Sequence, residues 1–399
     1  MAGNLRDRLK RIQQVKQTEN VIRNDALPDI SAFTAQGWVP AGHLTLRREV
    51  TADETIALPP TMPDSAGLVM PGIRADTDYH DLLFFDLETT GLSGGAGTVA
   101  FLAAFGRLDS TGKLRITQYL LLDYPGENDF IEALLGEFAG AVTMVSYNGK
   151  CFDSQILKTR CLMNGIAPPE YRHADLLHPA RRLWKRLLPN CSQATIETGI
   201  LGIDRTGDIP GAMAPDIWFA FLRHGETEPL LGICEHNRRD IAGLAAIFSA
   251  LVSIADDPFE AAKNSNYDLE ALALRWYEQC RYETDTSLCA TGQSLLRFAA
   301  EKKRPRAAFV YALSLFKAGQ RGDGRKWLLK TASADCPPSL QAAALRALAI
   351  DSERRLKNLT EARAFTEQAL DLLPPDSSSR KEFERRLQRL KLKSCHSSP

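Results

Sequence analysis

The chain has 399 residues, 44% hydrophobic and 25% charged, which is enough for two or three domains with cores of their own. This composition excludes a wholly disordered chain, a collagen-like repeat and a small disulfide-stapled secreted fold. The 49 Lys and Arg residues balance the 49 Asp and Glu residues, so the chain has no global positive field. Any contact with nucleic acid must come from local patches or through metal ions.

The distribution of cysteines and apolar residues indicates the cellular compartment in which the protein is expected. The 8 cysteines form no C-x-x-C pair, which leaves a zinc ribbon and a thioredoxin-type redox motif unsupported. The first residues are charged rather than apolar, so no signal peptide is indicated. The longest uncharged apolar run, 241–255, is too short to span a bilayer and reads as a buried helix. We therefore expect a soluble, cytoplasmic protein without membrane contact.

The first 80 residues are predicted to form an N-terminal segment in two parts. Residues 1–25 are rich in Arg, Lys and Gln with weak apolar spacing, which fits a basic amphipathic helix. The simpler interpretation is a solvated helix that packs on the domain, and an arm that binds nucleic acid is the less favoured one. Residues 26–80 carry many prolines and are expected to be irregular with short strands.

Residues 81–255 combine strands and helices. Apolar or alternating runs predict strands at 82–85, 98–105, 114–122 and 142–147. Helical spacing predicts helices at 130–138 and 153–163, and mostly helix from 178 to 255. Strands followed by alternating strands and helices predict an α/β domain with a mixed sheet.

Residues 265–393 show a helical period and no strand signal. The segments 313–332 and 355–374 both resemble the second half of a tetratricopeptide repeat, in which small residues let paired helices pack closely. A generic helical hairpin domain is the alternative. Either reading gives an α-helical C-terminal domain, with a frayed tail from Ser394 onward.

Two acidic residues stand at the end of the first strand of the α/β domain, in Phe85-Asp86-Leu87-Glu88-Thr89-Thr90-Gly91-Leu92. Residues two apart in a strand point to the same face, so Asp86 and Glu88 project their carboxylates side by side. Adjacent anions repel unless a cation lies between them, and oxygen ligands are those that Mg²⁺ or Mn²⁺ prefers. The plainer alternative is a pair of carboxylates on a solvated strand end.

Two further segments carry candidate chemistry. An Asn-Gly turn at Asn148 precedes Asp153, which stands where a helix begins. His236 and Asp240 precede the apolar run 241–255 and share one face if the helix already includes His236. For both aspartates the alternative is ordinary capping of a helix start.

The ordered motifs D-x-E-T-T-G-L, N-G-x-x-F-D and H-N-x-x-D resemble those of the DEDD superfamily of 3′–5′ exonucleases, which have a ribonuclease-H-like fold. The segments 174–184, 201–203, 208–211 and 236–240 look more narrowly like the YprB-type branch. The resemblance covers residues 81–255, and several members of that branch also end in tetratricopeptide-like helices. It implies a ribonuclease-H-like mixed sheet with flanking helices, followed by the α-helical domain.

The resemblance also implies roles for individual residues. Asp86, Glu88, Asp153 and Asp240 would bind two divalent ions, Mg²⁺ or Mn²⁺, with Asp86 bridging both. Superfamily members carry a His or Tyr near the last aspartate that orients or deprotonates the attacking water. His236 lies four residues before Asp240, which is the spacing of the tyrosine branch, whereas the histidine branch uses five. His236 is the best candidate for this water-positioning role, and a capping or buried histidine is the alternative.

Substrate contacts are expected around these motifs. Thr89, Thr90, Gly91 and Leu92 would form the turn that receives the 3′-terminal nucleotide, and Asn148 would position the substrate or its loop. Asp175 could sit near the metals, although capping is the favoured reading. The stretch 158–186 is basic, with Tyr171 and Trp184 interleaved, and could track a phosphate backbone and stack a base. A solvated basic helix face is the alternative.

These observations predict a metal-dependent 3′–5′ exonuclease that acts on the 3′ end of DNA or RNA by a two-metal-ion mechanism. The alternative is a scaffold whose inactive nuclease-like domain binds nucleic acid. In both cases the C-terminal helices could bind a protein partner. The intact carboxylates favour the enzyme, because a surface that only binds phosphate has no need of four converging anions.

Overall fold

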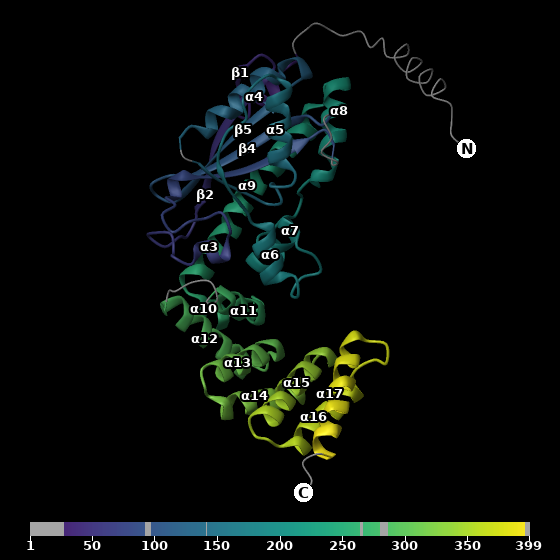
Figure 1. Ribbon diagram of the computed structural model, residues 1–399. Coiled ribbons are helices and arrows are strands. Elements are labelled where there is room, and N and C mark those ends of the chain that lie inside the picture. The colour runs from purple at the N-terminus through teal and green to yellow at the C-terminus, as the bar shows by residue number, and fades with distance from the viewer. Residues whose placement is uncertain (1–27, 92–96, 141, 264–265, 280–285, 396–399) are drawn as a thin grey trace, which may run out of the picture.

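The computed structural model describes residues 28–91, 97–140, 142–263, 266–279 and 286–395. The helix predicted over residues 1–25 and the substrate residue Leu92 lie outside these ranges. The described part of the chain has two regions, a sheet with flanking helices and a run of helices that extends away from it (Figure 1).

Seven strands form one mixed sheet in the order β1-β2-β5-β4-β3-β6-β7. Its antiparallel part contains β1 (Val39–Gly42), β2 (Thr45–Thr55), β5 (Lys113–Leu121), β4 (Ala100–Leu108) and β3 (Leu82–Thr89). The strands β6 (Thr143–Ser146) and β7 (Arg172–Asp175) continue it in parallel. The mixed sheet with flanking helices confirms the predicted fold class.

The N-terminal segment contributes to this sheet. We predicted irregular structure with short strands for residues 26–80, but β2 is 11 residues long and pairs with β5 from Thr45 opposite Leu121 to Thr55 opposite Lys113. The prediction that residues 26–80 are irregular with only short strands is therefore wrong for residues 45–55. All prolines of this segment lie outside β2, so they do not interrupt the pairing of β2 with β5.

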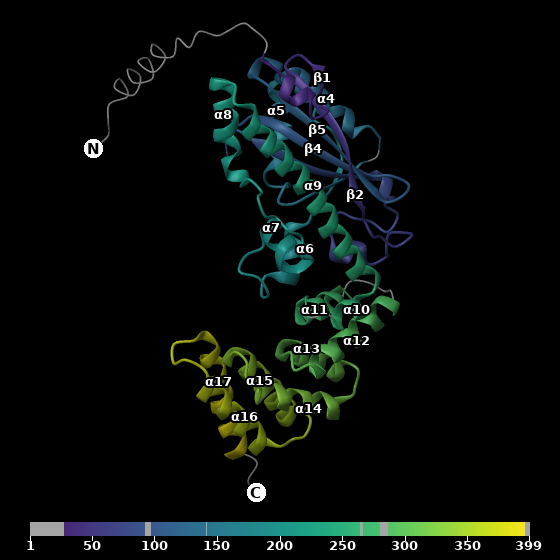
Figure 2. The same cartoon turned by 180° about the vertical axis from the view of Figure 1, so that it is seen from behind.

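Helices cover both faces of the sheet. One face packs against the long helix α9 (Thr227–Asp256), where Phe84 of β3 meets Phe248 with ring centroids 5.5 Å apart. The other face packs against α4 (Glu127–Leu135), α5 (Asp153–Met163) and α8 (Ala214–His224). Figure 2 shows α9 running the length of the sheet from behind. The apolar run 241–255 is therefore the buried part of a longer helix.

Shorter elements complete this region. They are α2 (Ser31–Thr34), α3 (Ala66–Val69), η1 (Tyr79–Asp81), η2 (Tyr124–Gly126), η3 (Gly136–Phe138), α6 (Leu177–Trp184), α7 (Gln193–Ile196), the π-helix η4 (Glu197–Leu201) and η5 (Gly211–Met213). The bounds of α5 are those that the sequence predicted. No helix in the described part of the chain is long and apolar enough to cross a membrane.

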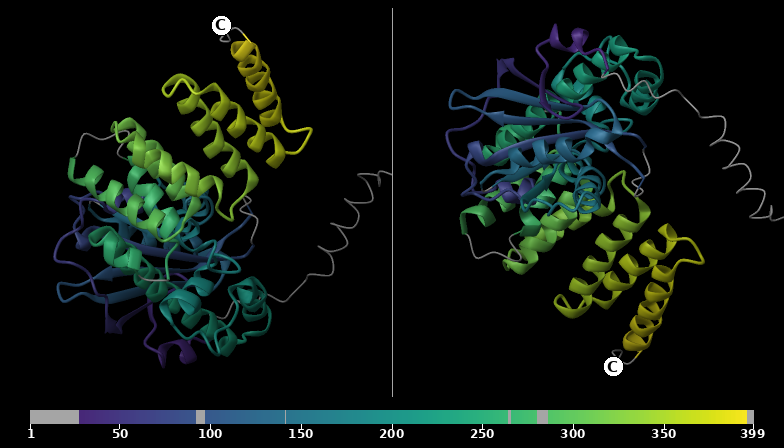
Figure 3. Two further views of the ribbon diagram at one scale, coloured as in Figure 1. Left: turned by 90° about the horizontal axis from the view of Figure 1, so that it is seen from below. Right: turned by 90° about the horizontal axis from the view of Figure 1, so that it is seen from above.

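The C-terminal region is helical throughout its described residues. It contains α10 (Pro258–Lys263), α11 (Leu269–Gln279), α12 (Thr286–Glu301), α13 (Pro305–Lys317), α14 (Arg321–Ala332), α15 (Pro338–Arg354), α16 (Leu359–Leu372) and α17 (Ser378–Cys395). In Figure 1, α10 and α11 lie next to the sheet region and α14 to α17 lie at the far end of the molecule. Seen from below and from above in Figure 3, the first of these helices (green) overlap the sheet and the last ones (yellow) lie to one side of it. Close packing depends on small residues, since a Cβ on Gly324 would lie 2.6 Å from the ring of Phe316. The helical C-terminal region is confirmed, and its likeness to a tetratricopeptide array stays a prediction.

Candidate active site

The strand β3 directs two carboxylates toward α9. Side chains alternate along a strand, and Leu82 and Phe84 belong to the core on the α9 side. Asp86 and Glu88 continue the same alternation and lie opposite Ala104 and Leu102 of β4. Both are partly buried. The side-by-side placement predicted from their spacing is therefore present, on the face that α9 covers.

The turn before α5 supplies the third carboxylate. Asp153 is the first residue of α5, directly after the turn at Asn148, whose φ is 66°. Asp175 at the end of β7 holds this turn, since it accepts backbone N–H bonds from Asn148 (2.8 Å), Lys150 (3.1 Å) and Leu177 (3.0 Å). These bonds give Asp175 the capping role that the sequence favoured.

The helix α9 supplies the remaining groups, because it begins at Thr227 and so includes both His236 and Asp240. Between them, the buried Asn237 donates from Nδ2 to Asp86 Oδ2 at 2.7 Å. Gln118 of β5 fixes this amide by donating from Nε2 to Asn237 Oδ1 at 3.1 Å. Asn237 therefore joins the helix to the first carboxylate of the cluster.

Three of these carboxyl groups have raised pKa values. Burial, followed by the charges of Asp240, Asp153 and Glu88, raises the pKa of Asp86 well above its usual range. Burial and the charges of Asp240 and Asp153 do the same to the pKa of Glu88. Burial raises the pKa of Asp153 to about 7. The residues thus form one acidic cluster, defined here as Asp86, Glu88, Asp153 and Asp240, whose members repel one another.

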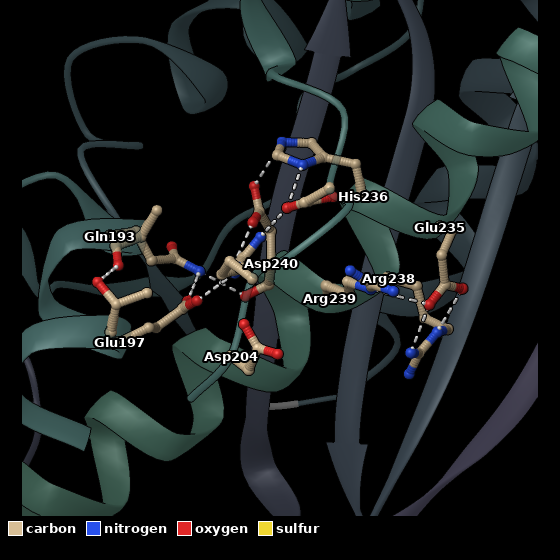
Figure 4. A network of polar contacts seen from close by, with 12 residues as sticks. Gln193, Glu197, Asp204, Glu235, His236, Arg238, Arg239 and Asp240 are labelled. Atoms are coloured by element: carbon tan, nitrogen blue, oxygen red, sulfur yellow. Dashed lines mark hydrogen bonds and ion pairs between the residues drawn. The ribbon is translucent and has the colours of Figure 1, made fainter. Parts of the chain in front are cut away.

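A buried arginine contacts the edge of the acidic cluster. Arg205 Nη2 forms an ion pair with Asp240 Oδ1 at 2.6 Å, and Nη1 donates to Asp208 Oδ2 at 2.8 Å. Its Nε donates to Glu197, which is fully buried. Although burial opposes it, the three carboxylates together raise the pKa of Arg205. Gln193 also donates to Glu197 and to the carbonyl oxygen of Asp240, and Figure 4 shows these three residues beside His236.

His236 lies between Asp208 and the acidic cluster. Its Nδ1 is 2.9 Å from Asp208 Oδ2, and its Nε2 is 3.3 Å from Asp240 Oδ2 and 3.9 Å from Glu88 Oε1. One ligand atom each from Glu88, His236 and Asp240 lie within 4.8 Å of one another. A Cβ on Gly211 would lie 3.0 Å from His236 Nε2, so glycine keeps the space beside this nitrogen open. Burial acts to raise the pKa of Asp208, but the hydrogen bonds from Arg205 and His236 outweigh it, and the pKa of Asp208 is lowered.

The predicted substrate residues stabilise the turn after β3. Thr89 Oγ1 donates to Gly91 O at 2.9 Å, and Thr90 Oγ1 accepts from Val99 N at 3.0 Å. The side chain of Asn148 is exposed at the other turn. Their predicted contacts with a 3′-terminal nucleotide remain predictions.

The basic stretch 158–186 is only in part a surface. Arg160 is buried and paired with Glu127. Trp184 is fully buried, and its Nε1 donates to Asn266 O at 3.0 Å. The prediction that Trp184 stacks a base is therefore wrong, because its ring fills the core between the sheet and the helical region. Lys158, Arg172, Arg181 and Lys185 are exposed.

Sequence reasoning missed several residues that contact the predicted set. Asn237 and Asp208 stand within the quoted segments 236–240 and 208–211, so adjacency in the motif was an available signal. Arg205, Glu197 and Gln118 come from other elements, and no spacing along the chain reveals that they reach α9.

A family comparison agrees with this arrangement. Residues 83–252 match the family model described as the RNase_H superfamily. The matched range runs from β3 to α9 and so contains every member of the acidic cluster.

Among curated proteins, the uncharacterized protein YprB of Bacillus subtilis (strain 168) is 36% identical to the chain over 212 residues. That alignment covers 52% of this chain and 50% of YprB, so the chain spans about half the length of this relative.

Among solved structures, exonuclease I has a TM-score of 0.27 at 18% identity, covering 40% of this chain and 45% of that one. E. coli exonuclease I in complex with an oligonucleotide gives 0.26 at 19% identity, covering 41% and 45%. The family B DNA polymerase of Pyrobaculum calidifontis gives 0.33 at 14% identity, covering 78% and 45%. These similarities are too distant to transfer a function to this chain.

Proposed function

We propose that residues 83–252, which match the RNase_H superfamily model, form a metal-dependent 3′–5′ exonuclease domain that hydrolyses the phosphodiester bonds of nucleic acid. The acidic cluster carries the proposal. Its carboxylates come from β3, α5 and α9, and burial together with the charges of the neighbouring carboxylates raises the pKa values of Asp86 and Glu88. A surface that only binds phosphate gains nothing from such a cluster, whereas a site for cations requires it.

The donor set fits divalent metal ions. It consists of carboxylate oxygens, which suit Mg²⁺ and Mn²⁺. In the described residues, Asp240 is the only member of the acidic cluster that Arg205 contacts. We assign Asp86, Glu88, Asp153 and Asp240 as the residues that hold two such ions. When bound, these ions supply Lewis-acid stabilisation of phosphate charge and lower the pKa of an attacking water.

The remaining residues position the cluster and the water. Asn237 holds Asp86 by a 2.7 Å hydrogen bond, and Arg205 holds one oxygen of Asp240, which leaves Oδ2 directed toward His236. His236 Nε2 faces Glu88 and Asp240, and it would accept a proton from a water bound beside them. The turn of Thr89, Thr90 and Gly91 at the end of β3 would receive the terminal nucleotide.

The test is hydrolysis of single-stranded DNA and RNA oligonucleotides labelled at the 5′ end, with Mg²⁺ or Mn²⁺. We expect a ladder that shortens one nucleotide at a time from the 3′ end. The ladder should be absent with EDTA and with Asp86→Ala, which removes a ligand rather than core volume. Which polymer is degraded identifies the substrate.

Three outcomes would contradict the proposal. Release of the 5′-terminal nucleotide as the first product would reverse the direction, and internal cuts would indicate an endonuclease. Intact substrate, with oligonucleotide binding retained and no heat of Mn²⁺ binding in calorimetry, would replace the enzyme by a nucleic-acid-binding scaffold.

A further inference from the structure

The ring of His236 has different partners at its two nitrogens. Nδ1 contacts Asp208 Oδ2 at 2.9 Å, while Nε2 faces Asp240 Oδ2 at 3.3 Å and Glu88 Oε1 at 3.9 Å. In Figure 4, His236 and Asp240 project from the same helix toward one another. One nitrogen is thus directed away from the acidic cluster and the other into it.

Asp208 has a fixed position in its loop. Arg205 Nη1 donates to the same Oδ2 at 2.8 Å, and Asp208 N donates to Arg205 O at 3.1 Å, closing a tight turn. Arg205 is itself bound to the fully buried Glu197. The carboxylate of Asp208 that faces His236 is therefore fixed by Arg205, which is in turn fixed by the buried Glu197.

This geometry determines which nitrogen carries hydrogen. An ionised carboxylate can only accept a hydrogen bond, so Nδ1 must donate its N–H to Asp208 whatever the charge of the ring. Any proton that the ring gains or loses then moves at Nε2. That atom is the one beside the acidic cluster and the open space at Gly211.

We propose that Asp208 is the positioning residue of His236, because it holds the ring in the Nδ1–H tautomer with Nε2 directed into the acidic cluster. The inference rests on the proposed nuclease function and deepens it. In the reaction, an O–H bond of the attacking water breaks and its proton goes to Nε2. The water oxygen bonds to phosphorus, the P–O3′ bond breaks, and the leaving 3′ oxygen takes a proton from solvent. The ring then releases the proton at Nε2 to solvent and keeps the one at Nδ1.

The first test reads the tautomer directly and needs no activity. Protein labelled with ¹⁵N-histidine is measured by long-range ¹H–¹⁵N correlation at about pH 9, where an unperturbed imidazole is neutral. The signals of His236 are assigned from their loss in His236→Gln. We expect the Nδ1–H pattern in the full chain with Mg²⁺. A wild-type ring protonated at Nε2 would overturn the inference.

The second test uses Asp208→Ala, with Asp204→Ala as the matched control. Asp204 is an exposed aspartate of the same loop, and its carboxylate accepts hydrogen bonds from Thr206 N and Thr206 Oγ1. We expect Asp208→Ala to shift His236 toward the Nε2–H tautomer and Asp204→Ala to leave its spectrum unchanged. An unchanged tautomer in a folded Asp208→Ala chain would also overturn the inference.

A double-mutant cycle separates positioning from a structural role. Asp208→Ala should lower kcat by about 10²-fold with little change in KM, as expected for an impaired proton acceptor. In the His236→Ala background it should cost almost nothing more. Equal losses in both backgrounds would show that Asp208 acts other than through His236. A chain with the Nδ1–H tautomer but no hydrolysis would contradict the proposed nuclease and leave the positioning contact established.

Discussion

The acidic cluster lowers the stability of the folded chain, and Asp153 shows how. Burial raises the pKa of this carboxyl to about 7 from an unfolded value near 4, so the folded state favours its neutral form. Stability from this group is complete below the unfolded pKa and is lost as the pH rises through the folded pKa. At neutral pH and above, the metal-free cluster therefore opposes folding unless a cation compensates it.

We therefore expect Asp153→Asn to stabilise the metal-free chain at pH 8 by on the order of 2 kcal/mol relative to wild type, and not at pH 4. Thermal unfolding in EDTA at both pH values measures this. Added Mg²⁺ should stabilise wild type and have little effect on the variant. Asp216→Asn is the control, since Asp216 is an exposed acid in the first turn of α8. Equal melting shifts for the two variants would contradict the electrostatic explanation.

Asn237 is the second residue whose removal has a defined cost. Its side chain is fully buried, donates to Asp86 and accepts from Gln118. Asn237→Ala would leave both partners short of a hydrogen bond, and we expect a loss of about 1–3 kcal/mol in unfolding free energy. Mn²⁺ binding, measured by calorimetry, should weaken as well because Asp86 loses its orientation. Asn128→Ala, which removes one exposed bond to Glu132, should be nearly neutral.

At the scale of elements, α9 packs against the π-helix η4 through a glycine. A Cβ on Gly243 would lie 1.7 Å from Glu197 Oε1 and 2.3 Å from its Cδ, so only glycine fits there. This contact matters for the site because Glu197 holds Arg205, which in turn contacts Asp208 and Asp240.

Gly243→Ala should destabilise the fold by more than about 2 kcal/mol, although alanine is the better helix former by about 1 kcal/mol. Glu197 would have to move away and release Arg205. Gly322→Ala in α14 is the control, because nothing lies within 4 Å of its added Cβ, and it should be neutral or slightly stabilising. Urea denaturation measures both. A stabilised Gly243→Ala chain would mean that Glu197 does not lie against this position.

The elements also show what the sequence predicts and where prediction fails. Helix α5 was predicted with its observed bounds and β3 at its apolar start, because local spacing and composition specify both. The strand β2 was missed, since its residues are mostly polar and its partner β5 lies about sixty residues away. Non-local pairing leaves no local signature.

The same division applies to the site. The carboxylates on β3, α5 and α9 were predicted from short motifs, and the structure brings them into one cluster. Arg205 and Asp208 were assigned no role, because their importance depends on reaching α9 across the fold. Trp184 was misjudged for the converse reason, since a basic neighbourhood along the chain says nothing about burial.

At the scale of the whole molecule, the sheet region and the helical region share a polar junction. Asp268 N donates to Leu183 O at 3.0 Å, and Arg186 Nη1 donates to Glu270 Oε2 at 2.9 Å. The buried Glu270 also accepts the backbone N–H groups of Arg306 and Ala307 at the start of α13. One carboxylate of α11 thus connects Arg186, in the segment after α6, to the start of α13.

Glu270→Ala should therefore uncouple the two regions. It removes the acceptor of the buried Ala307 N–H and of the Arg306 N–H, and one of the two carboxylate partners of Arg186. This predicts a loss of about 1–3 kcal/mol and a thermal transition that splits into two. Differential scanning calorimetry resolves such a split. Glu301→Ala breaks an exposed pair with Arg297 and should cost about 0.5 kcal/mol or less. If Glu270→Ala instead melts in a single transition at the wild-type temperature, Glu270 is not what couples the regions, and the packing around Trp184 together with the hydrogen bonds from Asp268 to Leu183 and from Trp184 to Asn266 is sufficient to do so.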